Sequence, residues 1–331
     1  MRVVADSHIP YLDIPQEVEL IHCDEITPRE AREADVLLVR TRTRCDAALL
    51  QGSKVRFIGT ATIGTDHIDL DYCQSHGITV CNAPGCNAPA VAQWTLSGIG
   101  HWMQTHGITS TSELTLGVVG VGHVGSIVAR WGEQLGFRVL RNDPPRCLEQ
   151  NTGNDVFSSL DEVLRQCDII TFHTPLTHEG PWPTLHLCNE DFLNRAQRCR
   201  LLMNAARGAI CDTAALLQWH GDLAIDCWEN EPHISLALLD KAFIATPHIA
   251  GYSLQGKQRG TTMIHDSLNA HFHWHIPPMD IDTPPLGAEK VTLSGIMASY
   301  NPLDDTATLK AAPLSFESLR NHYPLRQEFS E

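Results

Sequence analysis

The sequence lacks the features of a membrane-spanning or secreted protein. No hydrophobic run approaches the ~18 residues that cross a bilayer, and the first residues, M-R-V-V-A-D-S-H-I-P, contain no long apolar core like that of a signal peptide. The 11 cysteines form no C-x-x-C pair, which argues against a zinc site or a disulfide framework. The histidines of H-F-H-W-H at residues 271–275 would not share one face of a helix. We therefore expect a cytosolic protein with free thiols and no metal.

Positive charge is also scarce. The chain has 24 Lys and Arg residues against 39 Asp and Glu residues, a net charge of −15. Such a chain is repelled by polyanions, so we expect neither nucleic acid nor a membrane surface as a partner. An anionic substrate would need a local cluster of cations. The length of 331 residues predicts about two domains.

Residues 116–143 have the pattern of a dinucleotide-binding unit: an apolar strand, a G-x-G-x-x-G turn, a helix, and a second strand that runs into Asp143. The first glycine permits a tight turn, the second admits a pyrophosphate, and the third lets helix and strand pack closely. The helix N-terminus favours the phosphates, and the acid binds the ribose hydroxyls and repels a 2′-phosphate. Arg141 and Arg146 leave NADP as an alternative. The pattern predicts NAD, bound by Gly120, Gly122, His123, Val124, Gly125 and Asp143.

Short apolar segments alternate with helical patterns along most of the chain, which predicts an α/β fold. In residues 1–87 the predicted strands are Arg2–Ala5, Val36–Val39, Phe57–Thr60 and Ile78–Cys81. A helix over Ala88–Thr105, capped by Asn87, then leads to the glycine motif. From there the pattern predicts the six strands of a Rossmann sheet, at Leu116–Val119, Phe137–Leu140, Asp168–Phe172, Leu201–Asn204, Leu223–Asp226 and Phe243–Thr246.

Three polar residues follow the last three of these strands. Arg207, Glu231 and His248 would lie at the carboxyl edge of the sheet, where ligands bind in such folds. Arginine can hold a carboxylate as a bidentate fork. Histidine can take a hydroxyl proton near neutral pH, and a carboxylate can orient the imidazole. The three residue types together predict the oxidation of a hydroxy acid.

Four motifs resemble the D-isomer-specific 2-hydroxyacid dehydrogenase family: Gly120–Gly125, Asn204–Gly208, Asp226–Pro232 and Pro247–Gly251. The resemblance implies Arg207 as the carboxylate clamp, His248 as the acid/base, and Glu231, the glutamate before proline, as its partner. It leaves Glu229 as a solvated loop charge. It also implies further cofactor contacts from Thr174, Ala205, Ala206, Arg207 and Asp226.

Other stretches resemble one branch of that family, enzymes of pyridoxine (vitamin B6) biosynthesis that oxidise 4-phospho-D-erythronate with NAD. They are Gly59–His67, Ala83–Asn87, Asn142–Arg146, Phe172–Leu176 and His248–Thr262. This resemblance implies that Thr41, Thr62 and Tyr252 contact the substrate, as Arg207 does, and that Gly251 contacts the cofactor. Gln93 stands where related enzymes often carry glutamate. The C-terminal tail looks shorter than the dimerisation region of that branch.

The resemblance also implies the domain organisation. A Rossmann domain of residues 88–251 is inserted into a smaller, flavodoxin-like α/β domain of residues 1–87 plus 252–280. Residues 281–331 form a short C-terminal appendage, interpreted as a reduced dimerisation region. The expected assembly is a homodimer, which could instead use the Ala88–Thr105 helix, as in the wider family.

A phosphorylated substrate needs cations, and the sequence offers two sets. Arg40, Arg42 and Arg44 alternate after Val36–Val39 and would share one face if that strand continued. They could equally be a solvated strand end. Lys257 and Arg259, near Tyr252, are the other candidates.

Other functions also stay open. The chain could act on another D-2-hydroxy acid, such as phosphoglycerate, glyoxylate or hydroxypyruvate. It could be a non-catalytic NAD(H)-sensing protein, or a poorly active paralogue. The stretch G-Y-S-L-Q-G-K at residues 251–257 argues against the first alternative, and the Arg207, Glu231 and His248 set argues against the second.

Overall fold

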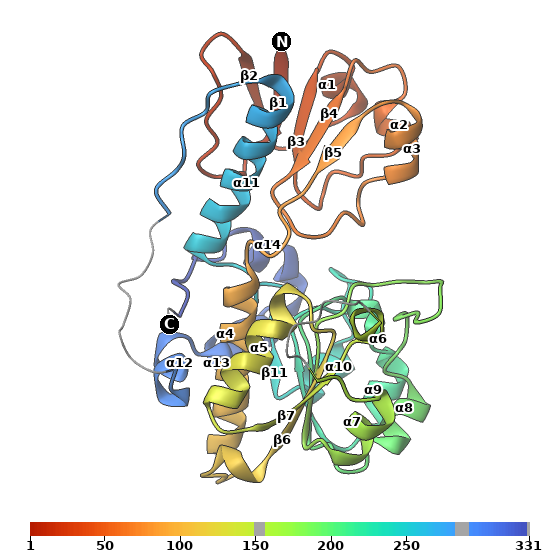
Figure 1. Ribbon diagram of the computed structural model, residues 1–331, viewed down its shortest axis with the longest axis vertical. Coiled ribbons are helices and arrows are strands. Elements are labelled where there is room, and N and C mark those ends of the chain that lie inside the picture. Colours follow the sequence, from red (N-terminus) through yellow and green to blue (C-terminus); the bar gives the residue numbers. More distant parts are fainter. Residues whose placement is uncertain (149–155, 282–290, 330–331) are drawn as a thin grey trace. The chain divides into compact units, whose positions relative to one another are not determined.

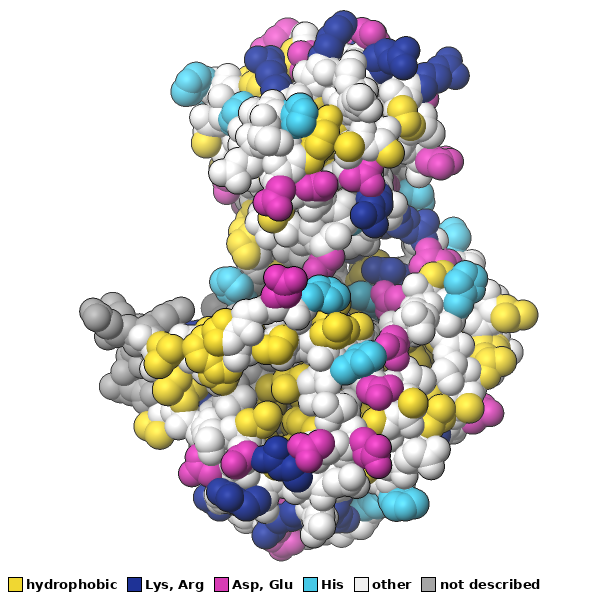
Figure 2. All heavy atoms as spheres, turned by 90° about the vertical axis from the view of Figure 1, so that its right-hand side faces the viewer, with side chains coloured by type: hydrophobic (Ala, Val, Ile, Leu, Met, Phe, Trp, Pro, Cys, Tyr) yellow, Lys and Arg dark blue, Asp and Glu magenta, His cyan; other side chains and the backbone are white. Residues whose placement is uncertain are grey.

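The computed structural model of the protein describes residues 1–148, 156–281 and 291–329 (Figure 1). Contacts divide the chain into unit 1, Met1–Asn87 with Ser253–Thr283, and unit 2, Ala88–Tyr252 with Pro284–Glu331. Each unit contains one parallel sheet with helices. No helix among the described residues is long and apolar enough to cross a membrane. Figure 2 shows acidic, basic and histidine side chains interspersed over the visible face of both units.

Unit 1 contains a five-stranded parallel sheet in the order β2-β1-β3-β4-β5, the 2-1-3-4-5 order of flavodoxin-like folds. Helices α1, α2 and α3 pack on one face and α11 on the other. The strand β2 was not predicted, because it lies at the sheet edge and none of its residues is fully buried. The elements are β1 Arg2–Asp6, β2 Glu19–Cys23, α1 Pro28–Arg32, β3 Val36–Val39, α2 Ala47–Leu50, β4 Phe57–Thr60, α3 Leu70–Ser75, β5 Thr79–Cys81 and α11 Leu254–Phe272.

Unit 2 contains a six-stranded parallel sheet in the order β11-β10-β9-β8-β6-β7. An isolated bridge joins Arg141 of β7 to Phe157. With Phe157 counted as a reduced third strand, the first six strands take the 3-2-1-4-5-6 order of a Rossmann sheet. The predicted α/β fold with a Rossmann sheet is therefore confirmed, although its third strand is reduced to one bridge. The strands are β6 Thr115–Val119, β7 Arg138–Asn142, β8 Ile169–Phe172, β9 Leu201–Asn204, β10 Asp222–Ile225 and β11 Ile244–Ala245.

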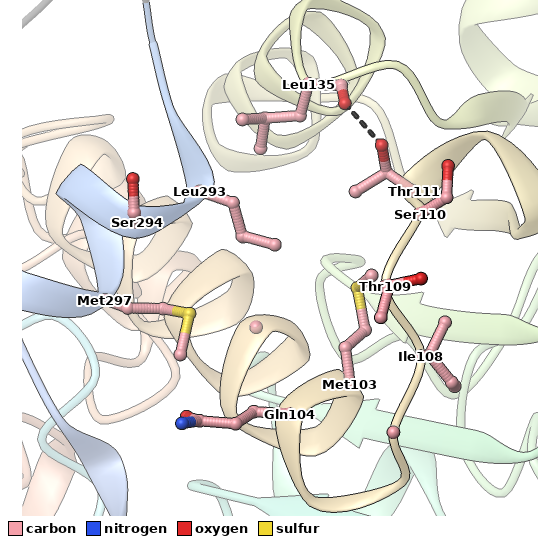
Figure 3. Close-up of a pocket in the computed structure, with 12 residues that line it drawn as sticks. Met103, Gln104, Ile108, Thr109, Ser110, Thr111, Leu135, Leu293, Ser294 and Met297 are labelled. Atoms are coloured by element: carbon pink, nitrogen blue, oxygen red, sulfur yellow. Dashed lines mark hydrogen bonds between the residues drawn. The ribbon is translucent and has the colours of Figure 1, made fainter.

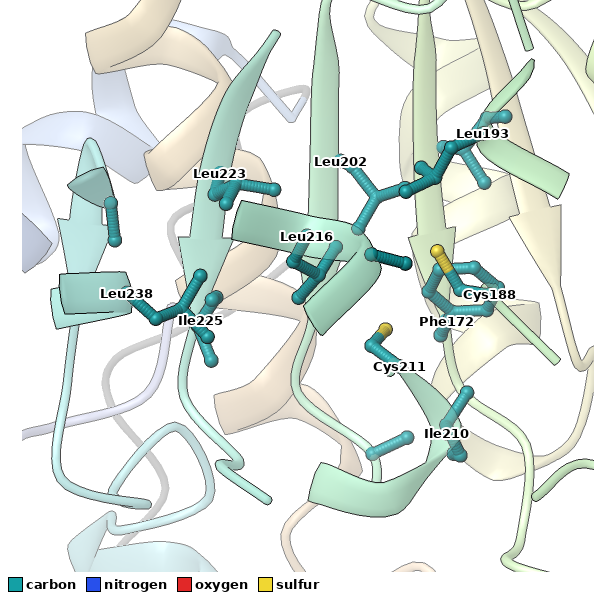
Figure 4. Close-up of a cluster of buried hydrophobic side chains, with 14 of the residues drawn as sticks. Phe172, Cys188, Leu193, Leu202, Ile210, Cys211, Leu216, Leu223, Ile225 and Leu238 are labelled. Carbon is teal, nitrogen blue, oxygen red and sulfur yellow. The ribbon is translucent and has the colours of Figure 1, made fainter. Parts of the chain in front are cut away.

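Helices cover both faces of this sheet because its buried residues alternate between the faces (Figure 1). One face packs against α4 and α5, and the other against α7, α8, α9 and α10. Figure 4 shows the second face, where Leu202 and Leu223 of the strands approach Leu216 of α9. The helices are α4 Ala88–Thr105, η1 Thr111–Glu113, α5 His123–Gln134, α6 Pro144–Cys147, α7 Leu160–Gln166, α8 Glu190–Arg195, η2 Gly208–Ile210, α9 Thr213–Gln218 and α10 Leu236–Lys241.

The C-terminal tail folds onto unit 2 as α12 Leu293–Ser299, α13 Pro302–Ala311, η3 Pro313–Ser315 and α14 Phe316–Asn321. Helix α12 lies so close to α4 that a Cβ on Gly100 would be 2.5 Å from the Met297 sulfur. Helix α13 is joined to β11 by a hydrogen bond from the Ala245 N–H to Thr306 Oγ1, at 3.0 Å. The tail is thus a docked part of this unit.

Helix α4 is mostly buried within the chain itself: 14 of its 18 residues are buried. Gln93 joins it to the tail, because its amide donates to Ser299 Oγ at 2.9 Å and to the Gln327 carbonyl at 3.1 Å. Little of α4 is therefore left accessible to form a dimer surface. The predicted cap is wrong, since the Asn87 Oδ1 is buried and has no hydrogen-bond partner among the described residues.

A cavity of about 710 Å³ lies between α4, α12 and the end of α5 (Figure 3). Met103, Leu293 and Met297 supply much of its apolar wall, and the polar side chains in its lining are a glutamine, serines and threonines. Among the described residues, its lining contains no acid, base or cation that could bind or convert an ionic substrate. The groups for chemistry lie elsewhere in unit 2.

Candidate active site

The glycine motif connects β6 to α5. Gly120 has φ +86°, in the left-handed region that suits glycine, and a Cβ there would be 2.7 Å from the backbone of His173. A Cβ on Gly125 would lie 1.9 Å from the Gly120 carbonyl oxygen. By contrast, nothing lies within 4 Å of the Cβ position of Gly122, which precedes the first helical residues His123 and Val124. This open space at a helix N-terminus suits a phosphate group.

Alanine at Gly122 and alanine at Gly125 should therefore have different effects. Gly122→Ala should leave the melting temperature nearly unchanged but weaken NAD binding about tenfold, because the methyl group occupies the space of the pyrophosphate. Gly125→Ala should destabilise the fold by about 1–3 kcal/mol, since helix and strand must move apart. Thermal melts and a fluorescence titration with NAD measure both effects. Wild-type NAD affinity in Gly122→Ala would contradict the phosphate position.

A cavity of about 690 Å³ opens at the carboxyl ends of β6, β7 and β8. Gly120, Gly122, Asp143 and Thr174 line it, together with apolar groups such as Pro144, Phe157 and Trp182. Two buried polar atoms in its wall, His173 Nδ1 and Thr174 Oγ1, have no hydrogen-bond partner among the described residues. A flat base could pack on the apolar groups, and the ribose and phosphates of NAD could supply the missing partners. The residues present therefore fit NAD.

His173 was not among the predicted cofactor residues. Burial lowers the pKa of its imidazole to about 3, so the ring is neutral at physiological pH. Its Nε2 lies 3.0 Å from Thr171 Oγ1, which leaves Nδ1 for a ligand. The F-H-T-P-L segment supplied the predicted Thr174 but gave no sign that its histidine would line the cavity.

Asp143 is held in place by the backbone of the cavity wall. Its Oδ2 accepts a hydrogen bond from the Val121 N–H at 2.8 Å, and its Oδ1 accepts one from the Arg146 N–H at 3.1 Å. A carboxylate has about four acceptor positions, so both ribose hydroxyls can still bind. Arg141 is held by Glu133 through bonds of 2.7 and 2.8 Å, and Arg146 donates to the Val121 carbonyl.

Replacing Asp143 by asparagine should weaken the discrimination against NADP. Asparagine still caps α6, so the change removes mainly the negative charge that repels a 2′-phosphate. We expect the ratio of kcat/KM for NADP to kcat/KM for NAD to rise on the order of tenfold. Steady-state kinetics with both cofactors measure the ratio, with Asp161→Asn, at an exposed position of α7, as the matched control. An unchanged ratio would show that another group selects the cofactor.

The turn after β9 carries Arg207 toward the turn after β10. The Asn204 side chain joins them by donating to the carbonyls of Arg207, at 2.9 Å, and Cys227, at 3.4 Å. A Cβ on Gly208 would be 2.0 Å from the Trp228 carbonyl oxygen, so only glycine permits this approach. Arg207 is half-buried, and its Nη1 donates to the Ala206 carbonyl at 2.8 Å. The guanidinium is thus held at the carboxyl edge of the sheet.

Glu231 and His248 form a close pair, with 2.5 Å between Glu231 Oε1 and His248 Nδ1. The other carboxylate oxygen accepts a hydrogen bond from the Trp228 N–H at 3.1 Å. Burial alone would raise the pKa of Glu231, but His248, Arg320 and this N–H together lower it. His248 has φ +56°, an uncommon conformation outside glycine. Because Glu231 binds Nδ1, Nε2 is the nitrogen that can exchange a proton with a substrate.

Asp226 was predicted to contact the cofactor, but the structure accounts for it as the support of the histidine loop. Its side chain is buried, and it accepts hydrogen bonds from Thr246 Oγ1 at 2.6 Å, the Ile249 N–H at 2.7 Å and the Ala250 N–H at 3.0 Å. Burial raises the pKa of this carboxyl group. Asp226 therefore fixes the segment between His248 and the predicted cofactor residue Gly251.

Glu229 is not a free loop charge, contrary to expectation. Its Oε1 lies 2.7 Å from His186 Nε2, and its Oε2 accepts a hydrogen bond from the Thr213 N–H at 3.1 Å. It joins the turn after β10 to α9. Ala205 and Ala206, also predicted to lie along the cofactor, are in the turn before Arg207, where the Ala206 N–H donates to Asn204 Oδ1 at 3.1 Å.

The arginines after β3 do not share one strand face, because β3 ends at Val39 and a turn follows. Arg40 is 11% exposed and binds the buried Asp6 at 3.0 Å, whereas Arg44 is exposed and binds Asp46 at 2.8 Å. Through this ion pair, Arg40 joins the turn after β3 to the end of β1 within unit 1. The shared strand face predicted for these arginines is therefore not formed.

The other predicted residues of unit 1 have local partners. Thr41 is exposed in the turn after β3. The Thr62 hydroxyl lies 2.6 Å from Thr60 Oγ1. Arg259 donates to the Cys86 carbonyl at 2.7 Å.

A family model for the D-isomer specific 2-hydroxyacid dehydrogenase, NAD binding domain, matches residues 87–250. The erythronate-4-phosphate dehydrogenase of Bacteroides thetaiotaomicron is 43% identical, in an alignment that covers 99% of this chain and 97% of the relative. The erythronate-4-phosphate dehydrogenase of Marinobacter nauticus is 40% identical, in an alignment that covers 100% of this chain and 93% of the relative. The chain belongs to the D-isomer specific 2-hydroxyacid dehydrogenases, among the erythronate-4-phosphate dehydrogenases. The predicted family and branch are confirmed.

A D-lactate dehydrogenase from Aquifex aeolicus, solved with NAD and lactic acid, has a similar structure. It is 25% identical, covers 82% of this chain and 96% of its own, and has a TM-score of 0.65. Together with the matched NAD-binding domain, this confirms the predicted NAD-dependent oxidoreductase. The cavity lined by Gly122 and Asp143 lies within the matched NAD-binding domain.

Proposed function

We propose that this chain oxidises 4-phospho-D-erythronate to 3-hydroxy-2-oxo-4-phosphobutanoate with NAD, as a step of pyridoxine biosynthesis. The observation that carries the proposal is the pair of Glu231 and His248, joined at 2.5 Å, at the sheet edge that also carries Arg207 and the NAD cavity. The full-length similarity to erythronate-4-phosphate dehydrogenases supports the choice of substrate.

The residues divide the chemistry between them. Arg207 holds the substrate carboxylate, and His248 Nε2 takes the proton of the C2 hydroxyl. Glu231 keeps Nδ1 protonated and stabilises the charged imidazole that results. NAD, when bound, accepts the hydride that leaves C2. Thr41, Thr62 and Tyr252 stay predicted substrate contacts.

A substrate panel tests this proposal. NADH formation is measured with 4-phospho-D-erythronate, D-erythronate and 3-phospho-D-glycerate, and NADH consumption with glyoxylate and hydroxypyruvate. We expect kcat/KM for 4-phospho-D-erythronate to exceed that for D-erythronate at least about 100-fold, because a site built for a charged group rejects an analogue without it. A preference for another acid would reassign the substrate. NAD binding without turnover of any acid would instead indicate an NAD(H)-sensing protein.

A cytosolic homodimer, implied by the resemblance, is also part of the proposal. Because the tail covers α4 and Gln93 is bonded to it, the dimer must use another surface of the chain. Light scattering of the purified protein measures the assembly directly.

A further inference from the structure

The C-terminal tail brings an arginine to the catalytic pair. The Arg320 side chain of α14 is 14% exposed, and its Nη1 lies 3.8 Å from Glu231 Oε1, the oxygen that binds His248. The same side chain forms a hydrogen bond with the Tyr252 phenol. We propose that Arg320 is a positioning residue, which holds the Glu231 carboxylate against His248 and the Tyr252 phenol beside it. The inference rests on the proposed catalytic role of His248.

The position of α14 is fixed by the packing of the tail. Phe316, at the start of α14, is 1% exposed and belongs to the core of the sheet. Lys310, near the end of α13, donates to the Ala242 carbonyl at 2.7 Å and to the Asp240 carbonyl at 3.2 Å. With both helices anchored, Arg320 extends from a rigid support toward the catalytic centre.

A second tail arginine holds the loop that carries His248. Arg326 donates to the Ile249 carbonyl at 3.0 Å, to the Tyr252 carbonyl at 3.2 Å and also to the Ala250 carbonyl. Its guanidinium lies 4.2 Å from the centre of the Tyr300 ring. The tail therefore supports the histidine loop through its backbone, and the glutamate and tyrosine through Arg320.

The charges around His248 explain why a cation is needed there. Two carboxylates act on the imidazole, Glu231 by direct contact and Asp226 from the end of β10. Both place negative charge beside the ring, and a nearby cation offsets part of that charge. Arg320 and Arg207 are the cations on this side, as both act on the neighbouring Cys227. Glu317, also 3.8 Å from Arg320, is the remaining acid of α14 near this group.

The test compares pH profiles of kcat/KM for 4-phospho-D-erythronate in the full-length wild-type enzyme, Arg320→Gln, Arg320→Lys and the control Arg195→Gln, which changes an exposed pair on α8. Arg320→Gln should lower kcat/KM at pH 7 about tenfold. It should also move the acid limb, the part of the profile where kcat/KM falls at low pH, up by on the order of half a pH unit, because loss of the cation makes His248 easier to protonate. Arg320→Lys should restore the limb to its wild-type position but not the full kcat. Arg195→Gln should match the wild type.

Two outcomes would overturn the proposal. Loss of activity in Arg320→Gln with an unmoved acid limb would mean that Arg320 only stabilises the fold, and full activity would mean no role at all. If Arg320→Gln does not fold in a thermal melt, Arg320→Lys decides, and wild-type kcat in that variant contradicts positioning. The wild-type assay distinguishes this proposal from the proposed function. If the wild-type enzyme turns over none of the acids, the proposed function is wrong, whatever the Arg320 variants do.

Discussion

Alanine in place of His248 should lower kcat at least about 100-fold, the scale of losing a general base. The side chain is 27% exposed and is paired with Glu231 at 2.5 Å, so its removal deletes the group that accepts the hydroxyl proton. NAD binding should stay within about twofold of the wild type, because the cofactor cavity is lined by other residues. Steady-state turnover and an NAD titration measure the two effects.

The matched control for this variant is His220→Ala. His220 is exposed in the same unit, so its removal should leave both turnover and NAD affinity unchanged. A fold check is needed because His248 has φ +56°, a conformation that alanine adopts less readily; His248→Asn tolerates it better and serves as the second variant. Wild-type turnover in either His248 variant would remove this residue from the mechanism.

The cofactor site could be predicted from the sequence because its signals are local. Three glycines at fixed spacing and an acid after the next strand lie within one continuous stretch, and the structure places Gly120, Gly122 and Asp143 around one cavity. Each glycine acts through neighbours that the motif itself supplies, such as the Gly120 carbonyl opposite Gly125. Arg207, Glu231 and His248 required the strand pattern and a family resemblance, because their partners are distant in the sequence.

The contribution of the tail could not be predicted in this way. Arg326 binds the carbonyl of Ile249, a residue 77 positions earlier in the sequence. Arg320 of the C-terminal tail likewise lies beside Glu231, which is distant in the sequence. No periodic pattern encodes such pairs, since each arginine alone looks like a surface charge. Arg40 is the opposite case. Its sequence context suggested a phosphate-binding residue, but the folded chain pairs it with Asp6, 34 positions earlier. Pairings of this kind depend on the folded sheet.

Arg207 is the residue for which we expect the largest loss of substrate affinity. Arg207→Ala should lower kcat/KM about 1,000-fold, because it removes one partner of a hydrogen-bonded charge pair with the substrate carboxylate. Arg207→Lys should recover only part of this loss, since a lysine cannot form the bidentate fork. Most of the effect should fall on KM, while the NAD affinity stays near that of the wild type.

The measurement is a full Michaelis curve for 4-phospho-D-erythronate in each variant, with Arg165→Ala, at an exposed position of α7, as the control. The alanine variant should fold, because the Asn204 bonds that shape this turn go to the backbone carbonyl of Arg207 and not to its side chain. A KM within a few-fold of the wild type in Arg207→Ala would show that another cation holds the carboxylate. Arg320 would then be the first residue to test, since it is the other cation beside Cys227.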